Sequence, residues 1–251
     1  MKKLIAANWK MNKNAKEAVS FAKELKKLAK EDKNAEIVIC PSFTLLSAVA
    51  DELKGSNIRL GAQNMHFESS GAYTGEISPS MLKEIGCEYV ILGHSERREH
   101  FNEGNESINK KVLSALKNGM KPILCIGETH EERLKELTDD VLEDQLLKCL
   151  DGVKDIKNVV IAYEPVWAIS KGDPNKKAAT KGDAEEAHLF IRQVLSGIYD
   201  EAAKEVRIIY GGSMKPENAK ELLGMRNING GLVGNASLDA KSFFEIIKAA
   251  K

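Results

Sequence analysis

Eight short, mostly apolar segments recur along the 251 residues of the chain, and this repetition constrains the fold more than any other feature. Most of the segments are continuous apolar runs, which is the pattern of parallel strands covered on both faces. They are Lys3–Asn8, Glu36–Cys40, Ile58–Gln63, Tyr89–Gly93, Pro122–Gly127, Val159–Tyr163, Val206–Tyr210 and Gly231–Gly234. The sequence therefore predicts a sheet of parallel strands.

Amphipathic helical patterns lie between these segments. Ala18, Ala22 and Leu25 follow one another at helical spacing, with Lys and Glu on the opposite face. The stretch Leu134–Cys149 is predicted to form a second helix, and Ala187–Ile198 a third. Strands that alternate with helices are typical of βαβ units in the α/β class.

Eight such units in 251 residues match the size of a closed (β/α)₈ barrel. No Pro-, Gly- or Ser-rich linker interrupts the series, so residues 1–251 are predicted to form a single domain. A doubly wound open sheet is the alternative. The even distribution of the units favours closure, and no G-x-G-x-x-G follows the first segment, which counts against a dinucleotide-binding fold.

Charge and cysteine usage narrow the class of protein. Lys plus Arg total 37 and Asp plus Glu total 37, so nothing indicates binding to nucleic acid or a membrane surface. The cysteines do not have the spacing of a zinc site, and no His/Asp cluster suggests another metal. The apolar start of the chain turns polar at Asn8, too early for a signal peptide. We expect a cytoplasmic protein without a metal ion.

Glu164 directly follows the sixth segment, and Pro165, which cannot donate to a strand ladder, comes next. An ionisable group at the end of an apolar strand is costly unless something uses it. Desolvation there would raise its pKa toward a value that suits a general base. A structural ion pair would give the same pattern, so this segment by itself leaves both roles open.

Active sites of (β/α)₈ barrels gather at the carboxyl ends of the strands, so the residues after the other segments are candidates too. Lys10 follows the first segment and could neutralise an anionic substrate; a surface lysine is the alternative. His94 follows the fourth segment, and Ser95 can cap a short helix there. That helix N-terminus would disfavour an imidazolium and leave a neutral proton donor. A structural histidine is the alternative.

Small residues accompany the carboxyl ends of the last two segments, at Gly211–Ser213 and at Gly230–Gly234. Small residues let backbone N–H groups approach an anion, and phosphate sites in barrels commonly form after strands seven and eight. Either stretch alone is a weak signal, because tight turns also need glycine. Together they predict a phosphate site.

With these residues assembled, the whole chain resembles the triosephosphate isomerase family. The matching blocks are Ala7–Asn12, Gly61–Asn64, Tyr73–Glu76, Gly93–Arg98, Cys125–Glu128, Ala162–Ile169, Tyr210–Ser213 and Leu232–Gly234. The resemblance implies a TIM barrel that interconverts dihydroxyacetone phosphate and D-glyceraldehyde 3-phosphate through an enediolate, in glycolysis and gluconeogenesis, without a cofactor. This reaction is a standard example of tuned acid–base catalysis.

The resemblance also implies roles for the residues. Glu164 would be the base, His94 the neutral electrophile, and Lys10 the cation that stabilises the enediolate. The further residues implied are Asn8 for positioning the substrate, Glu96 as the partner of the lysine, and Ser170, Ser213, Gly234 and Asn235 for holding the phosphate.

Two departures from the family pattern concern the phosphate. The family's lid follows the sixth strand and excludes water; here the stretch Ile169–Thr180 is several residues longer and has Ser170 where Gly is usual. Asn235 stands where many members have Gly, and Asn tolerates a left-handed backbone better than most residues.

Members of the family are usually homodimers. The resemblance implies that the loop Tyr73–Glu76, with Thr74 at the interface, enters the partner and supports Lys10 and His94. Asn64 and Met65 also resemble interface positions.

Three other functions stay open on the residues alone. The longer lid suits an isomerase for a larger sugar phosphate. A phosphate-binding protein without efficient turnover would keep the same residues. A glycosidase needs two facing carboxylates, and Glu164 alone ends a segment in the required way.

Overall fold

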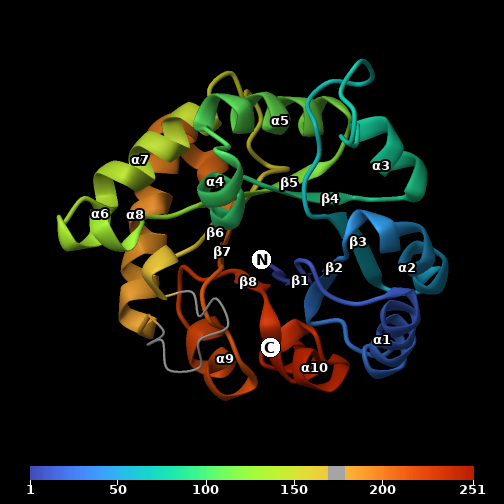
Figure 1. Cartoon of the computed structure of the whole chain (residues 1–251). Helices are drawn as coiled ribbons and strands as arrows, with labels where there is room; N and C mark the ends of the chain where they lie inside the picture. Colours follow the sequence, from blue (N-terminus) through green and yellow to red (C-terminus); the bar gives the residue numbers. More distant parts are fainter. Residues whose placement is uncertain (169–178) are drawn as a thin grey trace.

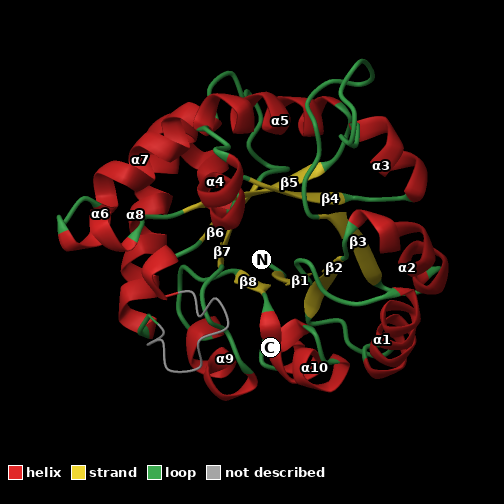
Figure 2. Ribbon diagram, in the orientation of Figure 1, coloured by secondary structure: helices red, strands yellow, loops and turns green. Residues whose placement is uncertain are grey.

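The computed structural model describes residues 1–168 and 179–251. Within them the strands pair in sequence order, all in parallel, and close into a barrel. Helices form a ring around the barrel, as Figure 1 and Figure 2 show. The sheet closes because β1 pairs with β8, from Leu4 opposite Gly230 to Ala7 opposite Val233. The predicted (β/α)₈ barrel is confirmed, and an open sheet is excluded.

The strands lie where the apolar segments predict them, and no strand end differs from its segment by more than one residue. They are β1 Lys3–Asn8, β2 Ala35–Cys40, β3 Ile58–Ala62, β4 Tyr89–Leu92, β5 Lys121–Ile126, β6 Val160–Tyr163, β7 Arg207–Tyr210 and β8 Gly230–Val233.

Several helices of the outer ring begin at side chains that accept hydrogen bonds from the free N–H groups of the first turn. Asn14 caps the first helix, accepting from the N–H of Glu17 at 3.0 Å, and Thr180 with Asp183 caps the longest one. The described helices are α1 Ala15–Leu28, α2 Leu46–Leu53, α3 Pro79–Ile85, α4 Ser95–Phe101, α5 Asn105–Lys117, α6 His130–Leu134, α7 Thr138–Cys149, α8 Lys181–Tyr199, α9 Pro216–Leu223 and α10 Ala240–Lys248, with the single turns η1 Phe43–Leu45, η2 Val166–Ala168, η3 Asp200–Glu205 and η4 Asn235–Ser237. Among them, none is long and apolar enough to cross a lipid bilayer.

The helix predicted over Leu134–Cys149 is wrong in its first part. The structure has two helices, α6 and α7, and Glu136 between them adopts a left-handed backbone with φ of 59°. Leu134 is 72% exposed and Leu137 is 37% exposed, so neither belongs to the buried stripe of α7. Leu134 and Leu137 have helical spacing but are exposed, and for this reason the predicted helix began before the real start of α7 at Thr138.

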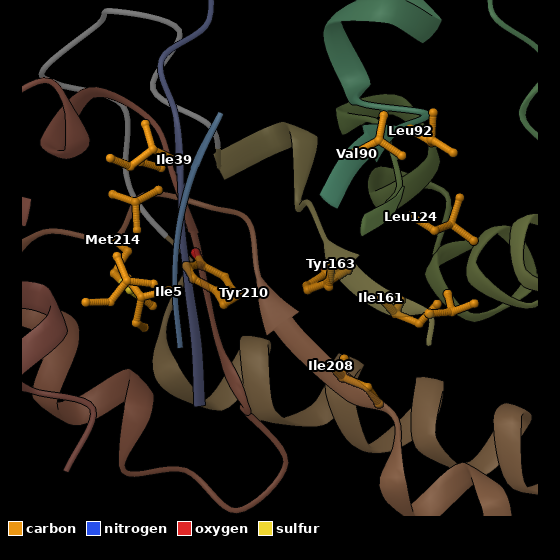
Figure 3. Close-up of a cluster of buried hydrophobic side chains, with 14 of the residues drawn as sticks. Ile5, Ile39, Val90, Leu92, Leu124, Ile161, Tyr163, Ile208, Tyr210 and Met214 are labelled. Carbon is orange, nitrogen blue, oxygen red and sulfur yellow. The ribbon is translucent and has the colours of Figure 1, made fainter. Parts of the chain in front are cut away.

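Two layers of apolar side chains fill the barrel and its surroundings, because side chains alternate between the faces of a strand. The cluster that includes Leu4, Ala6 and Ala162 fills the interior. The alternate residues pack outward against the helices, and Figure 3 shows part of that layer, including Ile5 and Ile161. Two polar residues at the carboxyl ends of strands continue the interior series: Asn8 after Leu4 and Ala6, and Glu164 after Val160 and Ala162. The alternation therefore directs both toward the mouth of the barrel.

Candidate active site

Glu164 lies at the end of β6 and is only 2% exposed. Its backbone N–H donates to the carbonyl of Ile126 on β5 at 2.7 Å, which extends the pairing of the two strands by one residue. Its Oε2 accepts from the N–H of Ser95 at 2.8 Å, and its Oε1 lies 3.0 Å from Nε2 of His94. The two residues predicted as base and proton donor are thus in direct contact.

Two glycines make room for Glu164. A Cβ at Gly127 would lie 1.8 Å from the carbonyl oxygen of Glu164, and a Cβ at Gly211 would lie 2.8 Å from its Cγ. Gly127 meets rigid backbone, whereas Gly211 borders the side chain itself. Neither glycine was predicted to border Glu164, although both immediately follow strands adjacent to β6 in the barrel.

His94, not Ser95, is the cap of α4. Its Nδ1 accepts from the N–H of Glu96 at 3.2 Å, whereas Ser95 is the first residue of the helix. The Ser95 hydroxyl is buried and has no hydrogen-bond partner among the described residues. Because Nδ1 accepts a hydrogen bond, the proton of a neutral ring lies on Nε2, facing Glu164.

The pKa directions of this pair differ from those predicted. Burial is the largest influence on the pKa of His94 and lowers it, but the carboxylates of Glu164 and Glu96 together raise the pKa above its ordinary value. Burial raises the pKa of Glu164, but His94, the N–H of Ser95 and Lys10 together hold it below its ordinary value. With no ligand bound, the pKa of Glu164 is therefore lowered where its strand position predicted a raised one, and the pKa of His94 is raised where the helix N-terminus predicted a lowered one, because each group stabilises the charged form of the other.

Lys10 follows β1 with a left-handed backbone, φ 52°. Its Nζ donates to Oε1 of Glu96 at 2.6 Å, as the resemblance implied for these two residues. Its N–H donates to Oδ1 of Asn8 at 3.0 Å, and its carbonyl accepts from Nε2 of Gln63 at 2.9 Å. Both neighbours hold the unusual backbone of Lys10, and the ammonium stays 24% exposed at the barrel mouth.

Two loops at the mouth present unused backbone donors. The N–H groups of Gly212, Ser213, Gly234 and Asn235 have no acceptor among the residues that the structure describes. The second loop lies against the lysine, since a Cβ at Gly234 would be 3.6 Å from Cε of Lys10. Asn235 starts η4 and is not among the residues with positive φ, so its tolerance of a left-handed backbone is not used. Free N–H groups beside an ammonium suit an anion.

Glu128, after β5, is a site residue that the sequence analysis quoted only as part of a motif. It is fully buried and accepts from the hydroxyl of Tyr163 at 3.0 Å and from Nε1 of Trp167 at 2.7 Å. Its carbonyl accepts from the N–H of Val166 at 3.2 Å. Glu128 therefore holds the chain on both sides of Glu164. Its position directly after a strand end was the available signal.

The remaining predicted residues are Ser170, Thr74, Asn64 and Met65. Ser170 and the stretch 169–178 lie outside the described residues. Thr74 is exposed, on a loop where Gly75 has φ of 92°. Asn64 and Met65 are 5% and 0% exposed within this chain, and the interface positions that the resemblance implied for them remain a prediction. Elsewhere in the described part of the chain, no group of three or more His, Cys, Asp or Glu side chains is placed to bind a metal ion.

Comparisons with known proteins agree with this geometry. The sequence profile described as "Triosephosphate isomerase" matches residues 3–250. The chain is 50% identical over 252 residues to the triosephosphate isomerase of Endomicrobium trichonymphae, covering 100% of this chain and 99% of that protein. It is 51% identical to that of Clostridium botulinum (strain Okra / Type B1), covering 97% and 98%. The crystal structure of triosephosphate isomerase from Bartonella henselae superposes with a TM-score of 0.91 at 39% identity, covering 99% of both chains.

Proposed function

The chain belongs to the triosephosphate isomerase family, and on this premise we propose that Glu164, His94 and Lys10 carry out the family's reaction. The enzyme interconverts dihydroxyacetone phosphate and D-glyceraldehyde 3-phosphate, a step of glycolysis. The observation that carries the assignment is the 3.0 Å contact between His94 Nε2 and Glu164 Oε1. A buried carboxylate and an N–H donor side by side can remove a carbon-bound proton while polarising the adjacent oxygen.

Substrate binding would change the state of the pair. If the substrate oxygen accepts the hydrogen bond of His94 Nε2, that nitrogen no longer donates to Glu164. Glu164 then loses an interaction that lowers its pKa in the free site. Burial, the largest single influence on this carboxyl, would then raise its pKa. The carboxylate becomes a stronger base only when substrate is present. Lys10 would stabilise the negative charge that develops on the enediolate oxygen.

The phosphate of the substrate would occupy the space between Lys10 and the two loops with free donors. The N–H groups of Gly212, Ser213, Gly234 and Asn235 can each donate to a phosphate oxygen. Asn8 is only 5% exposed, and a side chain held so firmly supports a role for Asn8 in positioning the substrate. The contact predicted for Ser170 remains part of this proposal.

The pH dependence of the reaction tests the pair. In the free enzyme, His94 lowers the pKa of Glu164, so the acid limb of kcat/KM, which reports the free enzyme's base, should lie low. We expect His94→Gln to move this limb to higher pH, because burial of Glu164 persists without the imidazole. The measurement is kcat/KM for glyceraldehyde 3-phosphate from pH 4 to pH 9. An unchanged limb in this variant would show that Glu164 is not the titrating base.

We propose further that the chain acts as a homodimer whose interface includes Thr74. This residue and Tyr73 lie on an exposed loop, with Tyr73 45% exposed. An exposed aromatic side chain of this size is typical of residues that anchor an interface. The resemblance to the family implies that this loop lies beside Lys10 and His94 of the partner.

Replacing Thr74 with Arg tests the dimer. The added charge would be buried against the partner at a high cost, so we expect sedimentation to show monomers and kcat to fall by about tenfold or more as the supported side chains lose position. Ser47→Arg, which puts the same charge on the exposed face of α2, is the control. A dimeric, fully active Thr74→Arg would place the interface elsewhere.

Two broader proposals complete this function. Residues 1–251 form one catalytic domain, because β1 and β8 pair and so close a single barrel. The protein works in the cytoplasm, unattached to membranes, where the triose phosphates of glycolysis occur. Its free, buried cysteines Cys40, Cys87, Cys125 and Cys149 suit that reducing compartment.

A further inference from the structure

Lys13 makes contacts that a solvent-facing lysine does not make. It lies in the loop between β1 and α1, three residues after Lys10, and has a left-handed backbone with φ of 73°. Its Nζ donates to the carbonyl oxygen of Leu238 at 2.7 Å. The ammonium also lies 5.3 Å from the ring centroid of Trp9 and 5.0 Å from that of Phe21.

The aromatic side of this arrangement is rigid. Trp9 and Phe21 are 0% and 4% exposed, and their rings meet edge to face at 4.9 Å. An ammonium over two buried ring faces is attracted by both. Trp9 immediately precedes Lys10. The contact with the two rings therefore holds the ammonium of Lys13 at the start of the loop that also carries Lys10.

The other end of the contact is the loop after β8. Leu238 follows η4, and its N–H donates to the carbonyl of Asn235 at 3.0 Å. Ser237 donates from its N–H to the carbonyl of Gly234 at 2.8 Å. Leu238 therefore belongs to the same hydrogen-bonded turn as the free donors of Gly234 and Asn235.

We propose that Lys13 is a positioning residue for the isomerisation, which clamps the β1–α1 loop to the turn at residues 234–238. The clamp holds the ammonium of Lys10 and the N–H groups of Gly234 and Asn235 at the spacing that a phosphate dianion needs. This inference rests on the proposed phosphate site. It gives a function to a residue that touches neither the substrate nor the base.

The left-handed backbone of Lys13 provides a sharp test, because side chain and backbone effects can be separated. Lys13→Gly removes the side chain but suits the positive φ, since glycine adopts it without strain. Lys13→Ala removes the side chain and keeps the strain. Lys13→Arg keeps a cation that can both donate to a carbonyl and stack on aromatic rings. Lys16→Ala, at an exposed position of α1, is the control.

We expect kcat/KM for glyceraldehyde 3-phosphate to fall about tenfold in Lys13→Ala and in Lys13→Gly, mainly through a higher KM. Displacing positioned groups by about 1 Å can cost up to about 10²-fold. Lys13→Arg should stay within about threefold of the wild type. Turnover of glyceraldehyde, which has no phosphate to bind the N–H groups of Gly234 and Asn235, should fall less than turnover of glyceraldehyde 3-phosphate in Lys13→Ala and Lys13→Gly. The dissociation constant of 2-phosphoglycolate, measured by calorimetry, should rise in parallel with KM.

Several results would overturn the clamp: normal kinetics in Lys13→Ala, recovery in Lys13→Gly, or equal losses with and without the substrate phosphate. Lys10→Met separates this inference from the proposed function. If Lys10→Met loses activity and Lys13→Ala does not, the clamp alone is wrong. If Lys10→Met is fully active, the phosphate and enediolate role of Lys10 is wrong. Thermal melting of each variant identifies any loss that comes from unfolding.

Discussion

Glu164→Gln is expected to lower kcat by about 10³-fold or more, since general-base catalysis contributes about 10² to 10⁴-fold and the amide cannot accept the substrate proton. The amide can still accept from the N–H of Ser95, which lies 2.8 Å from Oε2 in the wild type, so the fold should persist. Steady-state kinetics in both directions, with the dissociation constant of 2-phosphoglycolate, give the test.

Glu164→Asp is the matched variant. It keeps the charge and withdraws the carboxylate by about one C–C bond, a displacement that can cost about 10²-fold. The two variants should therefore differ, with the amide more damaging than the shorter acid. Near-normal turnover in Glu164→Asp, or equal activity of both variants, would contradict the assignment of Glu164 as the base.

Gly211→Ala is expected to lower kcat by about 10²-fold, with a much smaller effect on inhibitor binding. The new Cβ would lie 2.8 Å from Cγ of Glu164 and 3.1 Å from the carbonyl oxygen of Tyr163. The carboxyl side chain can rotate away and the backbone cannot, so the base should be displaced while the strand end stays in place. Kinetics and thermal melting of the variant measure the two effects separately.

The control for this variant is Gly197→Ala in α8. No heavy atom of the described residues lies within 4 Å of a Cβ built at Gly197, and alanine in a helix interior is about 0.8–1.0 kcal/mol more favourable than glycine. We expect it to be fully active and slightly more stable. If Gly211→Ala keeps kcat within about threefold of the wild type, steric control of Glu164 by this glycine is refuted.

The barrel and its site could be predicted to a large extent because they rest on local patterns. Continuous apolar runs identified β1 to β8, and a polar residue after a run identified Asn8 and Glu164. The contact of Lys10 with Glu96, at 2.6 Å, followed from the family resemblance. Prediction was weaker where exposed residues imitate a pattern, as Leu134 did for α7.

Protonation could not be predicted in the same way. The burial of Glu164 was evident from its strand and correctly indicated an upward influence on its pKa. The opposite influence comes from His94, which is far away in sequence and meets Glu164 only when the barrel closes. Burial is the largest single influence on the pKa of Glu164, but His94, the N–H of Ser95 and Lys10 together outweigh it, and no local pattern reveals these neighbours.

The sequence by itself determined the number and order of the strands and the family, and it supplied the residues proposed to react, because these depend on residue type and spacing along the chain. Only the tertiary structure decided how those groups interact. It alone revealed the contact of Glu164 with His94, the glycines that border the base, and the bond from Lys13 to Leu238 across 225 residues. These depend on distances in space between segments that the chain itself keeps apart.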